Sequence, residues 1–137
     1  MLLNLNKNIK ESDASLLAKK AIFYSSFLKN KYKLVKPPLY HNFLVNIGLK
    51  KRGLCWHFAY DMLKMAKNLK LNSFDYYIGG ANINNYWSEH NSLVVTCKGC
   101  SFEEGIVMDP WRKSGELYFN FLKNDKEYKW NQRGSKR

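Results

Sequence analysis

The sequence predicts a single α+β domain in which N-terminal helices pack on a small antiparallel sheet. The chain has 137 residues, a length that suits one domain with its own hydrophobic core. Apolar residues recur at helical spacing in the first half, and strand-like runs follow from about residue 74, an order typical of α+β folds. We expect the domain to span residues 1–137, with a polar lead-in over 1–11 and a tail over 124–137 that is polar except for Tyr128 and Trp130, which could dock back on the domain.

The first helix is expected to follow Ser12 or Asp13, because either side chain can accept hydrogen bonds from the amides of a first helical turn. It should end before Pro37-Pro38, since a residue that precedes proline disfavours the helical backbone. Its apolar positions fall at helical spacing: Leu17, Ala21, Tyr24 and Leu28.

Two further helices are predicted before the strands begin. A short helix should carry Phe43, Leu44 and Ile47 on one side and end near Gly48. A longer helix should run from Cys55 to about Leu69. Its apolar stripe consists of Ala59, Met62, Ala66 and Leu69.

Four strand patterns follow the helices. They cover residues 74–78, 90–96, 105–109 and 117–121. Lys98-Gly99 supplies turn residues between the second and third strands, which are therefore predicted to form a hairpin. Pro110 has no backbone N–H to donate and is expected to end the third strand.

The formal net charge is +12, and most of it lies in the first part of the chain. Residues 1–53 hold 11 basic and 2 acidic side chains, a net charge of +9. Lysine supplies 19 of the 23 basic residues, although arginine is better suited to bidentate recognition of phosphates. The chain also has 15 asparagines, and an AT-rich coding sequence would produce both surpluses. We therefore expect a solvated lysine surface, with a preference for acidic substrates rather than a nucleic-acid partner.

The composition indicates a globular protein without a membrane span. Hydrophobic residues make up 45% of the chain, which excludes a disordered protein. No apolar run approaches the ~18 residues of a membrane span. The first six residues show no apolar stretch typical of a signal peptide, so a cytoplasmic location is expected, unless an export signal was removed from the natural protein.

Cys55 is the candidate nucleophile. It stands where the long helix should begin, and the free amides and positive dipole of a helix N-terminus favour a thiolate. The alternative is an inert cysteine packed in a core. Of the three histidines, His57 should point away from Cys55, about 200° around the helix, and His41 has no evident acid to orient it. His90, which opens a strand, is the candidate base.

Asp109 is the candidate third member of a catalytic triad. If the second and third strands form an antiparallel hairpin, direct pairing of His90 with Asp109 centres the turn between Gly99 and Cys100, where turn residues occur. Opposed residues share a face, with Cβ atoms ~4.5–5.5 Å apart, so the carboxylate could orient the imidazole. A shift of one residue would place Asp109 on the wrong face.

These residues carry a resemblance to a known family. Gly53-Leu54-Cys55 before a helix, His90 on a strand and Asp109-Pro110-Trp111 ending the next strand resemble the transglutaminase-like superfamily, which has a papain-like cysteine protease fold. The resemblance covers roughly residues 50–112 of the chain. A wider set is similar to a little-described bacterial subgroup: Pro37-Pro38, His41-Asn42, Asn46, Lys51 to Cys55, and Phe102 to Gly105.

The resemblance implies a papain-like catalytic core and acyl transfer from an amide or ester through a thioester intermediate. Cys55 would be the nucleophile, His90 the general base and then acid, and Asp109 the residue that orients His90. The backbone amide of Cys55 would stabilise the oxyanion.

Other members of the site are less directly indicated. Papain-like enzymes have a glutamine shortly before the nucleophile, and this chain has Lys50, Lys51 and Arg52 there. Asn46 is the nearest upstream side-chain amide and the candidate second oxyanion donor. Three tryptophans could line a substrate cleft or pack in the core: Trp56, Trp87 and Trp111.

Cys97 and Cys100 form a CxxC pair in the predicted turn. Two unpaired thiols, a disulfide or half of a metal site are all compatible with the sequence, and we favour the unpaired thiols. Structural zinc needs four ligands, and no second pair with suitable spacing exists, so neither metal nor cofactor is expected. A disulfide here would leave Cys55 as a free thiol.

The sequence therefore predicts a cysteine-dependent hydrolase or acyltransferase that acts on an amide bond of a peptide or protein substrate. The alternative is a catalytically idle module that binds a peptide or nucleic acid through its basic N-terminal half. The sequence does not predict the oligomeric state.

Overall fold

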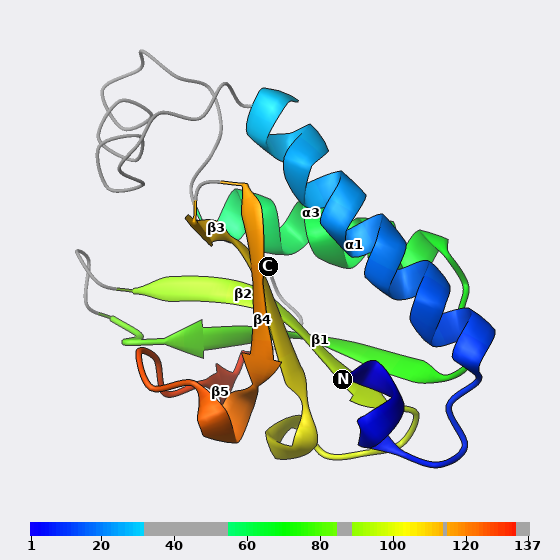
Figure 1. Cartoon of the computed structure of the whole chain (residues 1–137). Helices are drawn as coiled ribbons and strands as arrows, with labels where there is room; N and C mark the ends of the chain where they lie inside the picture. Colours follow the sequence, from blue (N-terminus) through cyan, green and yellow to red (C-terminus); the bar gives the residue numbers. More distant parts are fainter. Residues whose placement is uncertain (32–54, 85–88, 114, 134–137) are drawn as a thin grey trace.

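The computed structural model describes residues 1–31, 55–84, 89–113 and 115–133, apart from the side chain of Cys55. The predicted α+β class is confirmed, because helices cover one face of an antiparallel sheet with the strand order β4-β3-β2-β1-β5 (Figure 1). The helical elements are η1 (Leu2–Leu5), α1 (Glu11–Lys31), α3 (Cys55–Asn68), η2 (Phe102–Glu104) and η3 (Leu122–Asn124), of which the three η elements are 3-10 helices. The strands are β1 (Phe74–Ala81), β2 (His90–Cys97), β3 (Ile106–Lys113), β4 (Glu116–Phe121) and β5 (Asn131–Gln132).

Helix α1 turns a stripe of small and apolar residues towards the core. The buried positions are Ala14, Leu17, Ala21, Ser25 and Leu28. The predicted Tyr24 is only half-buried, and Ser25 takes the core position beside it. The Ser25 hydroxyl is satisfied there because it donates to the carbonyl of Gly115 at 2.7 Å. The helix begins at Glu11, slightly before the predicted caps.

Helix α3 closely matches the long helix expected from the sequence. Its stripe is fully buried and packs against β2 and β1 at Ala59, Met62 and Ala66. Leu69 lies just past the end of the helix and is half-buried. The expected helix end before Pro37-Pro38 and the expected short helix around residues 43–48 lie outside the described residues.

The four predicted strands are present, but the expectation that Pro110 ends the third strand is wrong. Strand β3 continues through Pro110 to Lys113. Its pairing with β2 runs from Ile106 to Met108, and its pairing with β4 is irregular between Asp109 and Lys113. Pro110 therefore lies where the ladder is interrupted, a position that tolerates a residue without an N–H.

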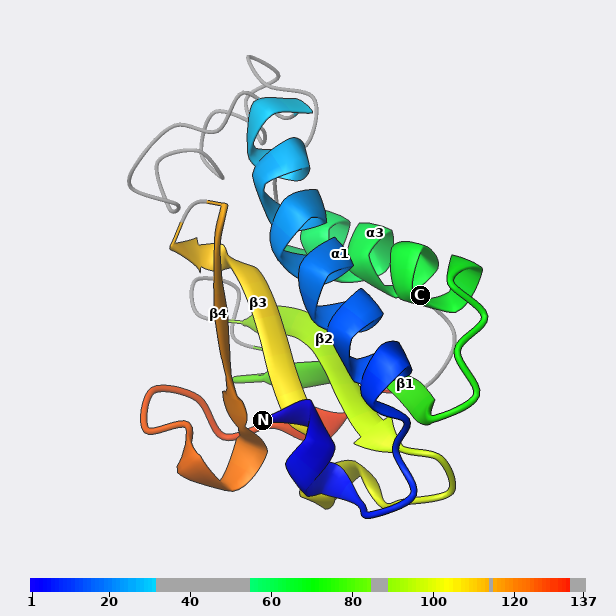
Figure 2. The same ribbon diagram turned by 45° about the vertical axis from the view of Figure 1, so that its right-hand side comes forward.

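The sheet has a hydrophobic cluster on each face. Residues of β2 and β3 that pack towards the helices include Leu93, Val95, Ile106 and Met108. The opposite face carries a smaller cluster of Ala81, Val94, Phe102, Val107 and Trp130. This second face is covered by the C-terminal segment, residues 122–133, which leaves β4 and ends as β5 paired with β1 (Figure 2).

Both regions expected to be polar extensions contribute to these clusters. In the lead-in, Leu2 and Ile9 are buried in the helix-side cluster. In the tail, Trp130 is only 8% exposed, and its ring packs in the cluster on the other face. The tail is therefore part of the fold as far as residue 133, because its aromatic side chains have a sheet face to cover.

Cys97 and Cys100 are joined by a disulfide at the end of β2. The expectation that we favoured, two unpaired thiols, is therefore wrong. The turn brings the two Cα atoms to 5.3 Å, within the range that a disulfide requires. Because the chain has three cysteines, Cys55 is the one that this disulfide does not use.

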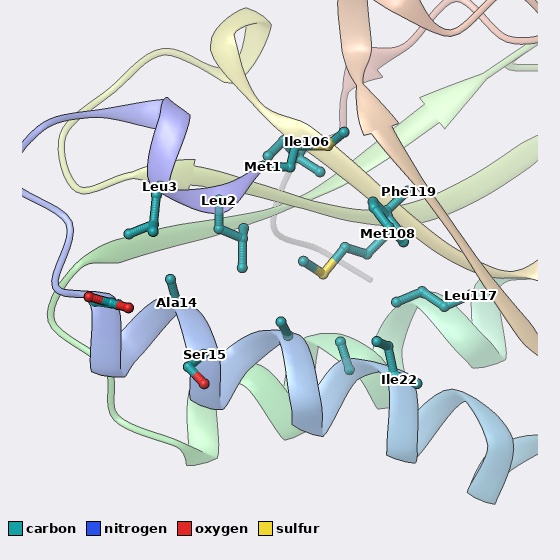
Figure 3. A pocket seen from close by; sticks show the side chains of 13 residues that line it. Met1, Leu2, Leu3, Ala14, Ser15, Ile22, Ile106, Met108, Leu117 and Phe119 are labelled. Carbon is teal, nitrogen blue, oxygen red and sulfur yellow. The ribbon is translucent and has the colours of Figure 1, made fainter.

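An apolar groove of about 390 Å³ lies on the helix side of the molecule, between η1, α1 and strands β3 and β4 (Figure 3). Its lining includes Met1, Leu3, Ile22, Met108 and Phe119. None of the candidate site residues lies among the described residues that line it. Although α1 exposes several apolar side chains, no helix in the described ranges is long and apolar enough to cross a membrane.

Adjacent leucines of α1 test this packing. Leu17 is fully buried, whereas Leu16 is 38% exposed. We expect Leu17→Ala to lower the free energy of unfolding by about 2–5 kcal/mol, since it leaves a cavity in the core. Leu16→Ala makes the same chemical change on the surface and should cost less than about 1 kcal/mol. Urea denaturation measures both, and equal losses would contradict the orientation of α1.

Candidate functional site

His90 and Asp109 come together in the structure. His90 is the first residue of β2, Asp109 lies within β3, and His90 Nε2 is 2.5 Å from Asp109 Oδ2. Both side chains are about 1% exposed, so water screens this contact weakly. Two of the three predicted triad residues are therefore in direct contact.

The strand register that produces this contact differs from the predicted register by two residues. Leu93 pairs with Met108, whereas direct pairing of His90 with Asp109 would have placed Leu93 opposite Ile106. A shift of two residues keeps each side chain on its face of the sheet, whereas a shift of one would not. His90 and Asp109 become diagonal neighbours, and their long polar side chains still reach each other.

The Asp109 carboxylate is held at both oxygens. Oδ1 accepts hydrogen bonds from the backbone N–H groups of Trp111, at 3.1 Å, and Arg112, at 3.2 Å. Oδ2 accepts from Arg112 Nε at 3.2 Å in addition to its contact with His90. Burial alone would raise the pKa of Asp109, but the charges and hydrogen bonds of His90 and Arg112 hold that pKa below its ordinary value. Asp109 is therefore ionised at neutral pH.

Arg112 links this carboxylate to the C-terminal segment. Its Nη1 and Nη2 donate to the two carboxylate oxygens of Asp125, at 3.3 and 2.9 Å. Asp125 also accepts from the indole Nε1 of Trp130 at 2.8 Å. The guanidinium lies over the ring of Tyr118, 3.9 Å from its centroid. Arg112 thus connects Asp109 to a segment that folds back from beyond β4.

Three aromatic rings surround the His90 imidazole. The ring centroids of Trp111, Tyr128 and Trp130 lie 4.7, 4.8 and 5.5 Å from that of His90. Trp111 was expected either to line a substrate cleft or to pack in the core, and it is only 9% exposed and packs on the histidine. By strand alternation His90 shares its face with Val94, which belongs to the cluster beneath the C-terminal segment.

Cys55 is the first residue of α3, as the sequence predicted. Both ribbon views place the first turn of α3 at the end of the sheet where β2 begins and β3 ends (Figures 1 and 2). Helix α3 packs on the face of the sheet opposite Val94. The side chain of Cys55 lies outside the described residues, and its contact with His90 remains a prediction.

The remaining candidates divide between surface, core and undescribed residues. Trp56 is 40% exposed in the first turn of α3. Its ring centroid lies 3.9 Å from that of His57, which is buried. The candidate oxyanion donor Asn46, the candidate cleft residue Trp87 and His41 lie outside the described residues.

The described residues contain no cluster of three or more His, Cys, Asp or Glu side chains that could hold a metal ion. The side chains that surround the His90–Asp109 pair are aromatic or already joined to one another. The Asp109 carboxylate is bonded to Nε2 of His90. Any proton transfer between His90 and a further group would therefore use the second ring nitrogen, Nδ1.

Sequence reasoning missed Arg112 and Asp125. Arg112 follows the recognised Asp109-Pro110-Trp111 run directly, and it is one of only four arginines in a lysine-rich chain. That rarity was an available signal, since arginine suits buried bidentate ion pairs better than lysine does. Nothing in the sequence marks Asp125 as its partner, because the contact depends on where the chain folds back after η3.

Comparisons with protein-family models, with curated proteins and with solved structures found no match to this chain. The assignment of a function therefore rests on the residues and the geometry described above.

The carboxylate of Asp109 can be tested by its effect on stability. Asp109→Asn keeps the shape and removes the charge, and it should lower the free energy of unfolding at pH 7 by about 3 kcal/mol or more. Because the folded-state pKa of Asp109 lies below its ordinary value of 3.8, its contribution is complete above that pH and is lost as the pH falls through the folded-state pKa. The difference between wild type and variant in urea denaturation should therefore shrink in acid.

Glu103→Gln is the matched control, because Glu103 is an exposed acid in η2. It should leave stability nearly unchanged at pH 7. A loss in Asp109→Asn that stays constant down to the lowest pH would contradict an ionised, ion-paired Asp109.

Proposed function

We propose that the protein is a cysteine-dependent hydrolase or acyltransferase of the transglutaminase-like kind, with Cys55, His90 and Asp109 as its triad. The observation that carries the proposal is the buried contact between His90 Nε2 and Asp109 Oδ2. A carboxylate on Nε2 selects the tautomer with a proton on that nitrogen, so Nδ1 is the nitrogen that can exchange a proton with a thiol.

The start of α3 supports Cys55 as the nucleophile. The first amides of a helix lack partners within the helix, and the helix dipole is positive there, so both favour a thiolate at the first residue. The backbone N–H of Cys55 is one of these amides, and it would stabilise an oxyanion by donating a hydrogen bond to it. Cys97 and Cys100 are consumed by their disulfide, which leaves Cys55 as the cysteine for this role.

The chemistry would proceed in two steps. With the thiol proton held at His90 Nδ1, the thiolate sulfur of Cys55 attacks the amide carbonyl carbon, and the C–N bond breaks as His90 passes that proton to the leaving amine. Water or a second amine then attacks the thioester, gives its proton to His90, and releases the acyl group as the sulfur recovers the proton. Asp109 stabilises the imidazolium that forms in each step.

The proposed substrate is a peptide or protein. Residues 1–53 carry a net charge of +9, which favours acidic substrates through long-range attraction. Trp56, which is 40% exposed and follows Cys55 directly in the sequence, would contact the substrate. Asn46 and Trp87 stay in the proposal as the second oxyanion donor and as a residue of the cleft.

Alkylation by iodoacetamide tests the activated thiol. Without reductant, Cys55 should be the residue modified, at a rate near neutral pH well above that of a free thiol with its ordinary pKa of ~8.5. His90→Asn should slow the reaction at neutral pH about tenfold or more, because the thiolate loses its imidazolium partner.

Peptide mapping locates the modified residue, and Cys55→Ala supplies the blank. His57→Asn is the control, because His57 is buried in the same helix and has no part in the proposed chemistry. A rate at Cys55 that rises only above pH 8 and ignores His90→Asn would sink the proposal.

A second function is favoured by one observation, the burial of the pair. His90 and Asp109 are each about 1% exposed beneath Tyr128 and Trp130, as a structural ion pair would be. In that case the protein is a catalytically idle module that binds peptides. Turnover of a peptide library that is abolished in Cys55→Ala identifies the enzyme, whereas binding without turnover, unchanged in Cys55→Ala, identifies the module.

A further inference from the structure

Four side chains with ionisable groups are buried together beside β3. They are His90, Asp109, Arg112 and Asp125, with side chains 1%, 1%, 8% and 0% exposed. Each is joined to another member of the group by a hydrogen bond or an ion pair. We name these four residues the buried cluster.

The charges of the buried cluster balance only if His90 is protonated. Burial opposes ionisation of Asp125, but its hydrogen bonds from Arg112 and Trp130 lower its pKa, so Asp109 and Asp125 are both carboxylates at neutral pH. Burial also opposes the charge on Arg112, but the carboxylates around it raise its pKa. Two anions and one cation leave one negative charge, which an imidazolium at His90 neutralises.

The contacts of Arg112 show why arginine is required at this position. Its Nε reaches Asp109 while its two terminal nitrogens grip Asp125, so one planar group sets the distance between the two carboxylates. The rings of Tyr118 and Tyr128 lie 3.9 and 4.7 Å from the guanidinium carbon and limit its rotation. An ammonium group could supply the charge but not these three directed contacts.

We propose that Arg112, held by Asp125, is a positioning residue that fixes the orientation of Asp109 and sets the charge on the His90 imidazole. Its direct effect, on the titration of His90, is independent of any activity. Its catalytic consequence rests on the proposed function, in which an imidazolium at His90 would favour the thiolate of Cys55.

Other charged and titratable groups surround the buried cluster and have to be considered with it. They are Lys113 of β3, Tyr118 of β4, Glu127 and Tyr128 of the C-terminal segment, and the Glu89–Arg133 ion pair beside the start of β2. Helix α3 packs on the other face of the sheet and carries His57 and Asp61 in its first two turns. Glu127 approaches Arg112 at 3.5 Å but is 60% exposed, so solvent screens its charge.

The test compares two variants that break the same hydrogen-bonded fork but change the charge in opposite directions. NMR follows the ring protons of His90 against pH in the full chain, which has only three histidines to assign. Arg112→Gln removes a cation and should raise the midpoint of the His90 titration by about one pH unit. Asp125→Asn removes an anion and should lower it by about one pH unit.

Two further variants separate charge from contact. Arg112→Lys keeps the charge without the fork, so its midpoint should stay closer to wild type than that of Arg112→Gln. Lys126→Gln removes an exposed cation of the C-terminal segment and should leave the midpoint nearly unchanged. A merely structural role for the fork predicts shifts in the same direction for Arg112→Gln and Asp125→Asn, and that result would overturn the proposal, as would shifts no larger than that of Lys126→Gln.

The same variants in the alkylation assay distinguish this inference from the proposed function. Opposite midpoint shifts together with an unreactive Cys55 would support the role of Arg112 and reject the enzyme. An activated Cys55 with unmoved midpoints would support the enzyme and reject the role of Arg112. If both hold, the pH profile of Cys55 alkylation should move with the His90 midpoint.

Discussion

The requirement that buried carboxylates be matched by cations governs the architecture around β3. Asp109 and Asp125 are almost completely buried, and Arg112 lies between them with bonds to both. Removing one partner of such a group leaves an unpaired charge in a medium that solvates it poorly. The position of the C-terminal segment therefore depends on an ion pair as well as on its aromatic side chains, and the orientation of His90 depends on both.

The two faces of the sheet have different structural roles. On one face α1 and α3 bury a conventional core, and the first residue of α3 is brought to the end of the sheet. On the other face the C-terminal segment provides Tyr128 and Trp130, which pack around His90. The candidate site lies at the end where these layers meet, so its assembly requires the helices, the hairpin and the segment together.

Periodicity was sufficient to predict the helices and the faces of the strands, because burial imposes it directly. It could not fix the hairpin register, since any even shift leaves the same residues on the same faces. The connection after β2 contains a disulfide and the helix η2, and this longer path moves the pairing by two residues from the tight turn inferred at Lys98-Gly99. The bond between Arg112 and Asp125 was not predictable, because no local pattern states where a chain returns.

The place of Asp125 and Trp130 in the chain has a consequence for biosynthesis. A ribosome makes Cys55, His90 and Asp109 before it makes the residues that clamp Arg112 and cover His90. Until residues 125–130 have been made, Arg112 lacks its main carboxylate and the sheet face around His90 lacks its aromatic cover. The surroundings of His90 and Arg112 are therefore completed only after the strands that carry both residues have been made.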